Sequence, residues 1–260
     1  MSNVKELLLV ADVETTGLST KTDRVCQIGI VGAFVDREAR DVEYFEIADR
    51  LCKPRGKIIS DETAKIHGVS QSMVDHLPYD DVVVAEAWNA TMDIVTQFHD
   101  EYPDGHITLS GYNSDRYDWP LLSNVHSPIL HAIADPGVWR LDGLVLAQRL
   151  YKGMSHKLGV MYKHLFNEEP VNAHNAAADC IMTARVMARM MTDNNLSLQA
   201  AVEMTSKVMI METMPFGKYE GKRCDEIPIS YFRWCKNNWT DISPDMLATI
   251  NHQLETRERK

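Results

Sequence analysis

Residues 7–19 read LLLVADVETTGLS, an apolar strand pattern that ends in two acids one residue apart. Side chains two positions apart on a strand point to the same face, so Asp12 and Glu14 stand side by side. Two buried carboxylates repel each other unless a cation lies between them, and oxygen ligands select hard ions such as Mg²⁺ or Mn²⁺. The alternative is a strand end that reaches solvent with incidental charges, and this spacing alone favours that alternative.

The length and composition are those of an ordinary globular protein, with 260 residues of which 45% are hydrophobic and 25% charged. This length predicts one large domain, or one domain with a small appendage. No apolar run approaches the roughly 20 residues of a membrane span. The short apolar N-terminal stretch contains Asp12 and Glu14, unlike a signal peptide. We therefore expect a cytoplasmic protein with no membrane association.

The cysteines and the net charge exclude several classes of protein. Five cysteines are scattered singly without a C-x-x-C pair, so we expect reduced core residues and neither disulfides nor a thiolate metal site. The net charge of −10 argues against a protein that coats nucleic acid with a broad basic surface. An enzyme that holds a few nucleotides in an acidic, metal-loaded cleft stays compatible with this charge.

The hydrophobic period predicts three strands at the start of the chain, over 5–13, 24–35 and 42–52, with short polar joins suited to antiparallel pairing. A further short strand is expected at His106–Ser110. Helical spacing occupies 61–67, 71–76, 81–101, 142–151, 155–166, 174–192 and 196–206. Strands followed by mixed helices and strands predict an α/β sandwich around one mixed sheet.

The pattern changes near residue 205. Residues 208–223 (VMIMETMPFGKYEGKR) turn β-like and contain two glycines, and two helices are expected after them. We therefore divide the chain into a domain over 1–205 and a small C-terminal α+β module over 212–260.

A second group of polar residues follows the short strand, in the stretch LSGYNSDRYDWPLL (109–122). It contains Asn113, Asp115 and Asp118. Pro120 marks the first turn of a helix, which also suits Asp118 as a simple N-cap.

A third group lies in VNAHNAAADCIMTARVMARMM (171–191), where His174 and Asp179 interrupt an apolar helical pattern. Within one helix, five residues would separate these two side chains by about 140° around the axis. They converge only if His174 lies in the loop before the helix. The small residues 176–178 let this helix lie close against the sheet, and a buried Asp179 needs a partner.

Together the three stretches resemble the motif set of the DnaQ-like DEDDh 3′-5′ exonucleases of the RNase T superfamily: D-x-E-T-T-G, an Asn with an Asp shortly after it, and H-x-x-x-x-D. The stretches AKIHGVS (64–70), LDGLVLAQRLY (141–151) and SHKLGVMYKHL (155–165) are also similar to this family, so the resemblance covers residues 5–192. One motif alone is a weak signal, whereas all three in order are a strong one.

The second motif departs from the commonest family pattern, because Asn113 and Asp118 are five positions apart where many members have four. The form G-Y-N-x-x-R-aromatic-D resembles exonuclease I-type members. This favours Asp118 over Asp115 as the motif acid.

The resemblance implies an RNase H-like fold, a mixed β-sheet flanked by helices, and two-metal-ion hydrolysis of a phosphodiester. It implies that His174 takes the proton from the attacking water, because imidazole changes charge near neutral pH. Two Mg²⁺ or Mn²⁺ ions would be held by Asp12, Glu14, Asp118 and Asp179. The substrate contacts implied in this domain are those of Thr15, Thr16, Gly17, Leu18 and Asn113.

The tail carries a second resemblance. Residues 214–238 (MPFGKYEGKRCDEIPISYFRWCKNN) are similar to the small C-terminal module of exodeoxyribonuclease X-like proteins. Lys218 and Lys222 stand among aromatic residues, and positive charge with aromatic faces suits a grip on single-stranded nucleic acid. The alternative is that Phe216, Tyr231 and Trp234 form the core of this module, since so small a module needs its large apolar residues.

We predict a metal-dependent 3′-5′ exonuclease that acts on DNA, at single-stranded or frayed ends, and releases nucleoside monophosphates. One alternative is an RNA 3′ exonuclease of the oligoribonuclease or RNase T-like kind, because the chemistry does not need the 2′-hydroxyl. Another is a catalytically silent nucleic-acid-binding module on the same fold. Nucleic acid is the expected partner, and a homodimer stays open. His67 and His156 are expected at packing or helix-terminal positions.

Overall fold

The computed structural model describes residues 5–35, 42–170, 174–239 and 242–258. The chain forms two compact units, Met1–Thr205 and Ser206–Lys260. Each unit has a hydrophobic core of its own.

In the described part of the first unit, five strands form one mixed sheet in the order β3-β2-β1-β4-β5. The central strand β1 pairs antiparallel with β2 and parallel with β4. This confirms the predicted mixed sheet. The strands are β1 (Glu6–Thr15), β2 (Val25–Phe34), β3 (Glu43–Leu51), β4 (His106–Gly111) and β5 (Trp139–Asp142).

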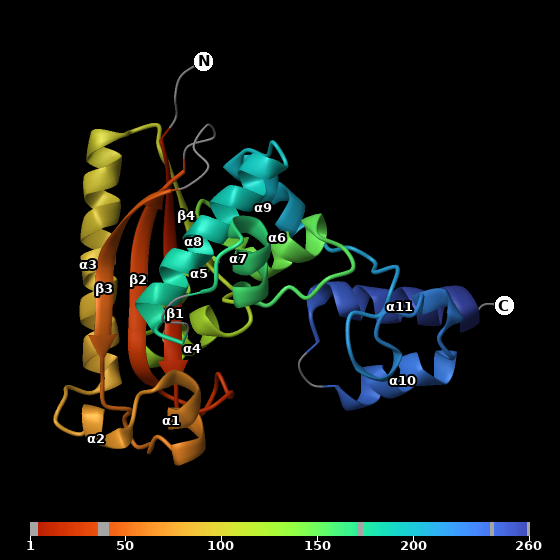
Figure 1. Cartoon of the computed structure of the whole chain (residues 1–260), viewed down its shortest axis with the longest axis horizontal. Coiled ribbons are helices and arrows are strands. Elements are labelled where there is room, and N and C mark those ends of the chain that lie inside the picture. The colour runs from red at the N-terminus through yellow and green to blue at the C-terminus, as the bar shows by residue number, and fades with distance from the viewer. Residues whose placement is uncertain (1–4, 36–41, 171–173, 240–241, 259–260) are drawn as a thin grey trace. The chain divides into compact units, whose positions relative to one another are not determined.

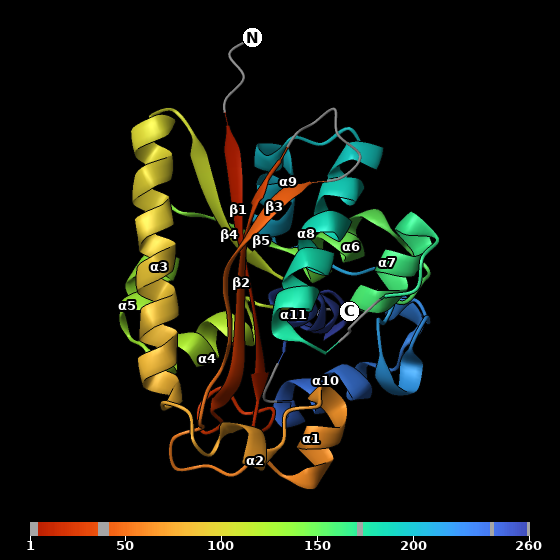
Figure 2. The ribbon, with the colours of Figure 1, turned by 60° about the vertical axis from the view of Figure 1, so that its left-hand side comes forward.

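Helices cover both faces of this sheet (Figures 1 and 2). One face packs against α3 (Asp80–Glu101), α4 (Asp118–Val125) and α5 (Pro128–Ala134). The other face packs against α6 (Gly143–Leu150), α7 (Leu158–Phe166), α8 (Ala176–Asp193) and α9 (Leu198–Ser206). Two short helices, α1 (Asp61–His67) and α2 (Gln71–Val74), follow β3.

The side-chain alternation of β1 decides where its acids lie. Leu7, Leu9, Ala11 and Val13 belong to the core on the α3 face, whereas Leu8 and Val10 belong to the core on the α8 face. Because side chains alternate along a strand, Asp12 and Glu14 continue the row of Leu8 and Val10. The two acids therefore lie on the face that α8 covers.

The N-terminal end of α8 lies very close to the sheet. A Cβ atom on Gly29 of β2 would lie 2.4 Å from the carbonyl carbon of Ala176. The thiol of Cys180, one turn further along, donates to the carbonyl oxygen of Gly29 at 3.4 Å. The small residues at the start of α8 thus allow the close packing that the sequence predicts.

The expected and observed elements differ at four points. Helix α5 and strand β5 were not predicted, and both are short. The expected helix over 174–192 begins only at Ala176, which leaves His174 in the preceding loop. The β-like prediction for 208–223 is met only by a short antiparallel contact, in which Thr213 forms an isolated bridge with Arg223 and the amide of Met214 donates to the carbonyl of Lys222.

The second unit contains helices α10 (Ile229–Asn238) and α11 (Pro244–Glu258) and two 3₁₀ turns, Gly217–Tyr219 and Cys224–Glu226. All five cysteines of the chain are buried and free. Among the described residues, no helix combines the length and the apolar character that crossing a membrane requires.

Candidate active site

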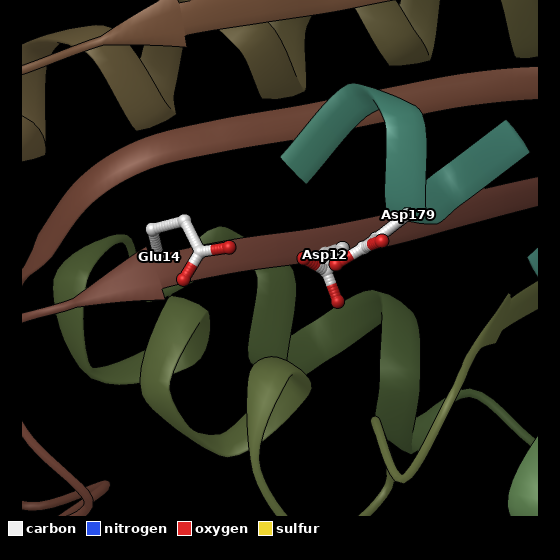
Figure 3. Close-up of side chains that lie close together, drawn as sticks. All are labelled: Asp12, Glu14 and Asp179. Carbon is white, nitrogen blue, oxygen red and sulfur yellow. The ribbon is translucent and has the colours of Figure 1, made fainter. Parts of the chain in front are cut away.

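Three carboxylates meet at the C-terminal end of β1. Asp12 and Glu14 extend from that strand, and Asp179 reaches them from the first turn of α8 (Figure 3). One oxygen of each residue lies within 4.8 Å of the others. Residues that are 165 positions apart in sequence (179 − 14) therefore form one cluster.

The start of α8 fixes the direction of Asp179. Asn175 is the N-cap, and its side-chain oxygen accepts a hydrogen bond from the amide of Ala178 at 3.1 Å. Such a cap satisfies one of the helix's free amides. Asp179 then stands in the first turn, beside the close contact between Ala176 and Gly29.

His174 lies just before this helix, with an exposed side chain and a φ of 67°. Positive φ is uncommon outside glycine, although histidine adopts it more often than most residues. The His174 amide donates to Oδ2 of Asp179 at 3.1 Å. The histidine thus lies in the loop and the acid in the helix, as the spacing requires, and they meet through the His174 backbone amide.

The fourth predicted acid, Asp118, is the first residue of α4 and only 4% exposed. Its Oδ1 accepts a hydrogen bond from the amide of Val13 at 3.2 Å. Val13 lies between Asp12 and Glu14 in β1, so Asp118 is held next to the cluster. In the described residues, Asp118 is outside the group of three that closes within 4.8 Å.

The four acids resist ionisation together. Burial, and then the charges of Asp118, Asp179 and Glu14, raise the pKa of Asp12 well above its ordinary range. Burial and the charges of Asp179 and Asp118 raise the pKa of Glu14 from 4.5 to about 7. Burial raises the pKa of Asp118 to about 7, although the hydrogen bond from Val13 opposes it. Burial also raises the pKa of Asp179.

Asp142, which the sequence analysis missed, holds the second motif in place. Its Oδ1 accepts from the amide of Asn113 at 3.0 Å, and its Oδ2 accepts from the amide of Asp115 at 3.1 Å. The same carboxylate caps α6 through the amides of Leu144 and Val145. Asp-Gly before an apolar helical run is an N-cap pattern, so the capping role was readable whereas the contact with Asn113 was not.

Asn113 and Asp115 both lie in the loop after β4. Asn113 has a φ of 66°, a left-handed conformation that asparagine tolerates better than most residues. Asp115 faces Arg140, with a nitrogen–oxygen distance of 3.6 Å. The acid that accompanies Asp12 and Glu14 is therefore Asp118, and Asp115 pairs elsewhere.

The loop after β1 is held by the hydroxyl groups of Thr15 and Tyr117. The Thr15 hydroxyl donates to the Gly17 carbonyl at 2.8 Å and lies 2.7 Å from the Tyr117 hydroxyl. The Tyr117 hydroxyl also donates to the Gly17 carbonyl. Tyr117, absent from the predicted site, precedes Asp118 directly and so connects this loop to the second motif.

The tip of the same loop is open to solvent. Leu18 is 90% exposed. The Thr16 hydroxyl donates to Oδ1 of Asp23 at 3.0 Å, and Oδ2 of Asp23 accepts from the Ser19 amide at 2.8 Å. A Cβ atom on Gly17 would lie 2.7 Å from the Asp23 carboxylate. The turn is thus rigid at its base and presents an apolar side chain outward.

His67 and His156 have the packing roles expected of them. His67 accepts at Nδ1 from the Val69 amide at 3.1 Å, and its Nε2 donates to the Thr15 carbonyl at 3.3 Å. His156 contacts the Tyr151 carbonyl and lies just before α7.

A cavity of about 840 Å³ adjoins the acid cluster on the side of α6 and α7. His174 and Asp179 line it, together with the side chains of Lys157 and Lys163. Glu169 also lines this cavity and forms an ion pair with Lys163.

Lys218 and Lys222, predicted to contact nucleic acid, are exposed residues of the second unit. The ammonium group of Lys218 lies 5.4 Å from the centre of the Tyr219 ring.

A mixed sheet that carries crowded acids at the end of its central strand, opposite a helix with one further acid, is the arrangement of the DnaQ-like exonucleases. The RNase T family model, described as exonuclease, matches residues 9–187. The chain therefore belongs to this exonuclease family.

Individual relatives are distant. Exodeoxyribonuclease 10 of Escherichia coli K12 is 22% identical over 256 residues, which are 96% of this chain and 99% of that protein. The zinc-bound complex of E. coli exonuclease I with single-stranded DNA has a TM-score of 0.51 and 20% identity, covering 73% of this chain and 41% of that one. A second exonuclease I structure has a TM-score of 0.52 and 19% identity, covering 76% of this chain and 42% of that one. These structures confirm the RNase H-like fold.

A different family model matches the end of the chain. It covers residues 203–240 and carries the description "Putative quorum-sensing-regulated virulence factor". The exonuclease match ends at Met187, before this second match begins at residue 203.

Proposed function

We propose that this chain is a metal-dependent 3′-5′ exonuclease that hydrolyses DNA from its 3′ end, at single-stranded or frayed ends, and releases nucleoside monophosphates. The observation that carries the proposal is the convergence of Asp12, Glu14 and Asp179 within 4.8 Å, beside Asp118. Membership of the exonuclease family supports it. We assign the hydrolysis to residues 1–205 and a separate role to the module over 212–260.

The donor set fits hard divalent cations. All four groups are carboxylates, the ligands that suit Mg²⁺ and Mn²⁺. Their raised pKa values come from burial and from one another's charge, so a bound cation relieves the repulsion that the folded chain otherwise maintains. We infer that Asp12, Glu14, Asp118 and Asp179 hold two ions. Two such ions supply an activated water and stabilise the attacking and leaving oxygens of a phosphodiester.

The chain's own residues then orient the catalytic carboxylates and take the proton from the attacking water. His174 sits in an exposed loop against Asp179, where its imidazole accepts the proton of the attacking water at the site. The hydrogen bond from the His174 amide helps to hold the Asp179 carboxylate toward Asp12 and Glu14. Asn113 keeps the loop of the second motif in its left-handed turn.

The loop over Thr15, Thr16, Gly17 and Leu18 is proposed to receive the terminal nucleotide. Its base is fixed by the Tyr117 hydroxyl and by Asp23. The exposed Leu18 side chain is then free to pack against the last base.

DNA is proposed as the substrate because the relative that aligns with nearly the whole chain is named an exodeoxyribonuclease. The test is hydrolysis of matched DNA and RNA oligonucleotides, labelled at either end, with Mg²⁺, with Mn²⁺ and with chelator. We expect mononucleotides from the 3′ end of DNA, no reaction in chelator and none with Asp12→Asn. Faster loss of RNA would move the proposal to an RNA exonuclease. Inactivity with no Mg²⁺ or Mn²⁺ uptake in calorimetry would instead indicate a silent module.

A further inference from the structure

Two aromatic side chains of the second unit, Phe216 and Trp234, stay outside its core, whereas Tyr219, Tyr231 and Trp239 are partly buried and pack against it. Its core of buried side chains comprises Met214, Cys224, Ile227, Phe232, Cys235, Met246, Ile250 and Leu254. Phe232 is the one aromatic residue of this group. The alternative in which Phe216, Tyr231 and Trp234 form the core is therefore wrong for Phe216 and Trp234, which are 48% and 51% exposed.

The two exposed rings and the three that pack against the core form one connected group, here called the aromatic cluster: Phe216, Tyr219, Tyr231, Trp234 and Trp239. Tyr231 and Trp234 stack with ring centres 5.9 Å apart and planes 19° apart. Trp239 joins Trp234 at 6.3 Å and Phe216 at 5.3 Å. Tyr219 meets the edge of Tyr231 at 4.7 Å.

Phe216 and Trp234, the two rings of the aromatic cluster that are about half exposed, point to a ligand. A unit of this size needs its large apolar side chains in the core, and monomers rarely expose contiguous apolar surface without a binding role. The rings also brace one another, so their exposed faces are held in fixed directions. Fixed aromatic faces lose little side-chain entropy when a planar ligand stacks on them.

The charge around the aromatic cluster favours a polyanion. Residues 214–239 contain five Lys or Arg and three Asp or Glu, a balance of +2 in a chain of net charge −10. Lys218 sits over the ring of Tyr219, and Lys222 is exposed nearby in sequence. Unpaired bases offer planar faces and a phosphate chain, which is the combination that aromatic rings and lysines bind together.

Resting on the proposed function, we propose that the aromatic cluster, with Lys218 and Lys222, is a second nucleic-acid site that stacks the unpaired bases of single-stranded DNA. It belongs to a unit distinct from the one that carries the acids. A strand held there stays attached while its 3′ end is processed, because linked binding sites raise one another's effective concentration. A protein partner or a second copy of the chain is the competing occupant.

The test measures binding of a long oligothymidylate to the full chain in chelator, which stops hydrolysis, by quenching of tryptophan fluorescence and by anisotropy of a labelled oligonucleotide. Trp234→Ala should weaken binding about 5- to 150-fold, the range for removal of one base–aromatic stack. Trp234→Phe should recover most of the affinity because it keeps a stacking face. Lys218→Ala together with Lys222→Ala should flatten the dependence of affinity on salt.

Leu247→Ala is the matched control, because Leu247 is an exposed apolar residue of the same unit, 41% exposed, on α11. It should bind like the parent. Unchanged affinity in Trp234→Ala, with native thermal melting, would overturn the second site, as would a self-association of the parent that this substitution abolishes. If the parent still hydrolyses DNA in either case, the proposed function stands and only this inference fails.

Discussion

The amide of Val13 donates a hydrogen bond to Oδ1 of Asp118 at 3.2 Å. This bond joins the central strand to the first residue of α4, at the position between Asp12 and Glu14. The backbone of one motif thus orients the acid of another, 105 positions away. This single bond leaves the carboxylate of Asp118 with lone pairs that a cation could use.

Substitution of Asp118 by asparagine tests its negative charge separately from the hydrogen bond that it accepts from Val13. Asp118→Asn keeps an oxygen that accepts from Val13, so we expect native melting and a loss of at least about 100-fold in the rate of hydrolysis, comparable to removal of one major catalytic interaction. Asp115→Asn is the matched control, because Asp115 faces Arg140 instead of the cluster. Assays on a 3′-labelled oligonucleotide should show near-normal activity for the control. The reverse order of the two activities would move the motif acid to Asp115.

His174 is expected to affect the rate and not the uptake of cations. We expect His174→Ala to lower the rate of hydrolysis by about 100- to 10,000-fold, the usual contribution of a general base. Calorimetric titration with Mn²⁺ should be unchanged, since the four carboxylates are intact. His156→Ala serves as the comparison, because His156 contacts the Tyr151 carbonyl. An active His174→Ala would remove this residue as the base.

Tyr117 is expected to act through the loop after β1. Tyr117→Phe keeps the ring and removes the hydroxyl that contacts Thr15 and Gly17. A neutral hydrogen bond contributes about 0.5–1.5 kcal/mol, so KM should rise about 2- to 10-fold with kcat little changed. Tyr44→Phe, on an exposed residue of β3, is the control. A fall in kcat at constant KM would contradict a role in holding the terminal nucleotide.

The site was readable from sequence where side-chain periodicity determines geometry. A strand places Asp12 and Glu14 on one face in any fold, and a helix of 3.6 residues per turn forces His174 out of the helix if it is to meet Asp179. The order of the three motifs along the chain then indicated the exonuclease family. These residues could be named without knowing which helix faces which strand.

Contacts that depend on three-dimensional packing were not readable. Asp142 and Tyr117 hold the motif loops, yet each looks like an ordinary helix cap or core ring in sequence. Strand β5 has four residues, so its alternation is too short to detect, and it is defined by parallel pairing with β4. The predicted β-structure over 208–223 shrinks to a short antiparallel contact, because only Met214 of its apolar residues is buried in the core, while Val208, Met209, Ile210 and Phe216 are exposed.

The crowded acids predict an unusual pH dependence of stability in the metal-free protein. The pKa of Glu14 is raised from 4.5 to about 7, so between these values the folded state binds more protons than the unfolded state. Stability must therefore fall as pH rises through this window. Thermal melting in chelator should show this fall, and Mg²⁺ should oppose it at the upper end. Glu14→Gln should reduce the slope. A stability that rises across the window would contradict the crowding.

At Gly29 the absence of a side chain allows α8, the helix that carries Asp179, to pack closely against β2. A Cβ atom there would lie 2.4 Å from the Ala176 carbonyl carbon and 2.5 Å from the Ala177 nitrogen, both backbone atoms that cannot rotate away. Gly29→Ala must push the start of α8 outward, and overpacking of this kind costs about 1–3 kcal/mol. Since Asp179 moves with the helix, we expect the rate to fall further than the stability loss explains. Gly159→Ala is the control, because Gly159 lies in α7, where alanine favours the helix, and the added Cβ atom would make only ordinary contact, at 3.4 Å, with the Pro170 side chain. Melting and initial rates of the two variants check this. A Gly29→Ala protein with parental rate and melting would show that α8 does not set the position of the acid.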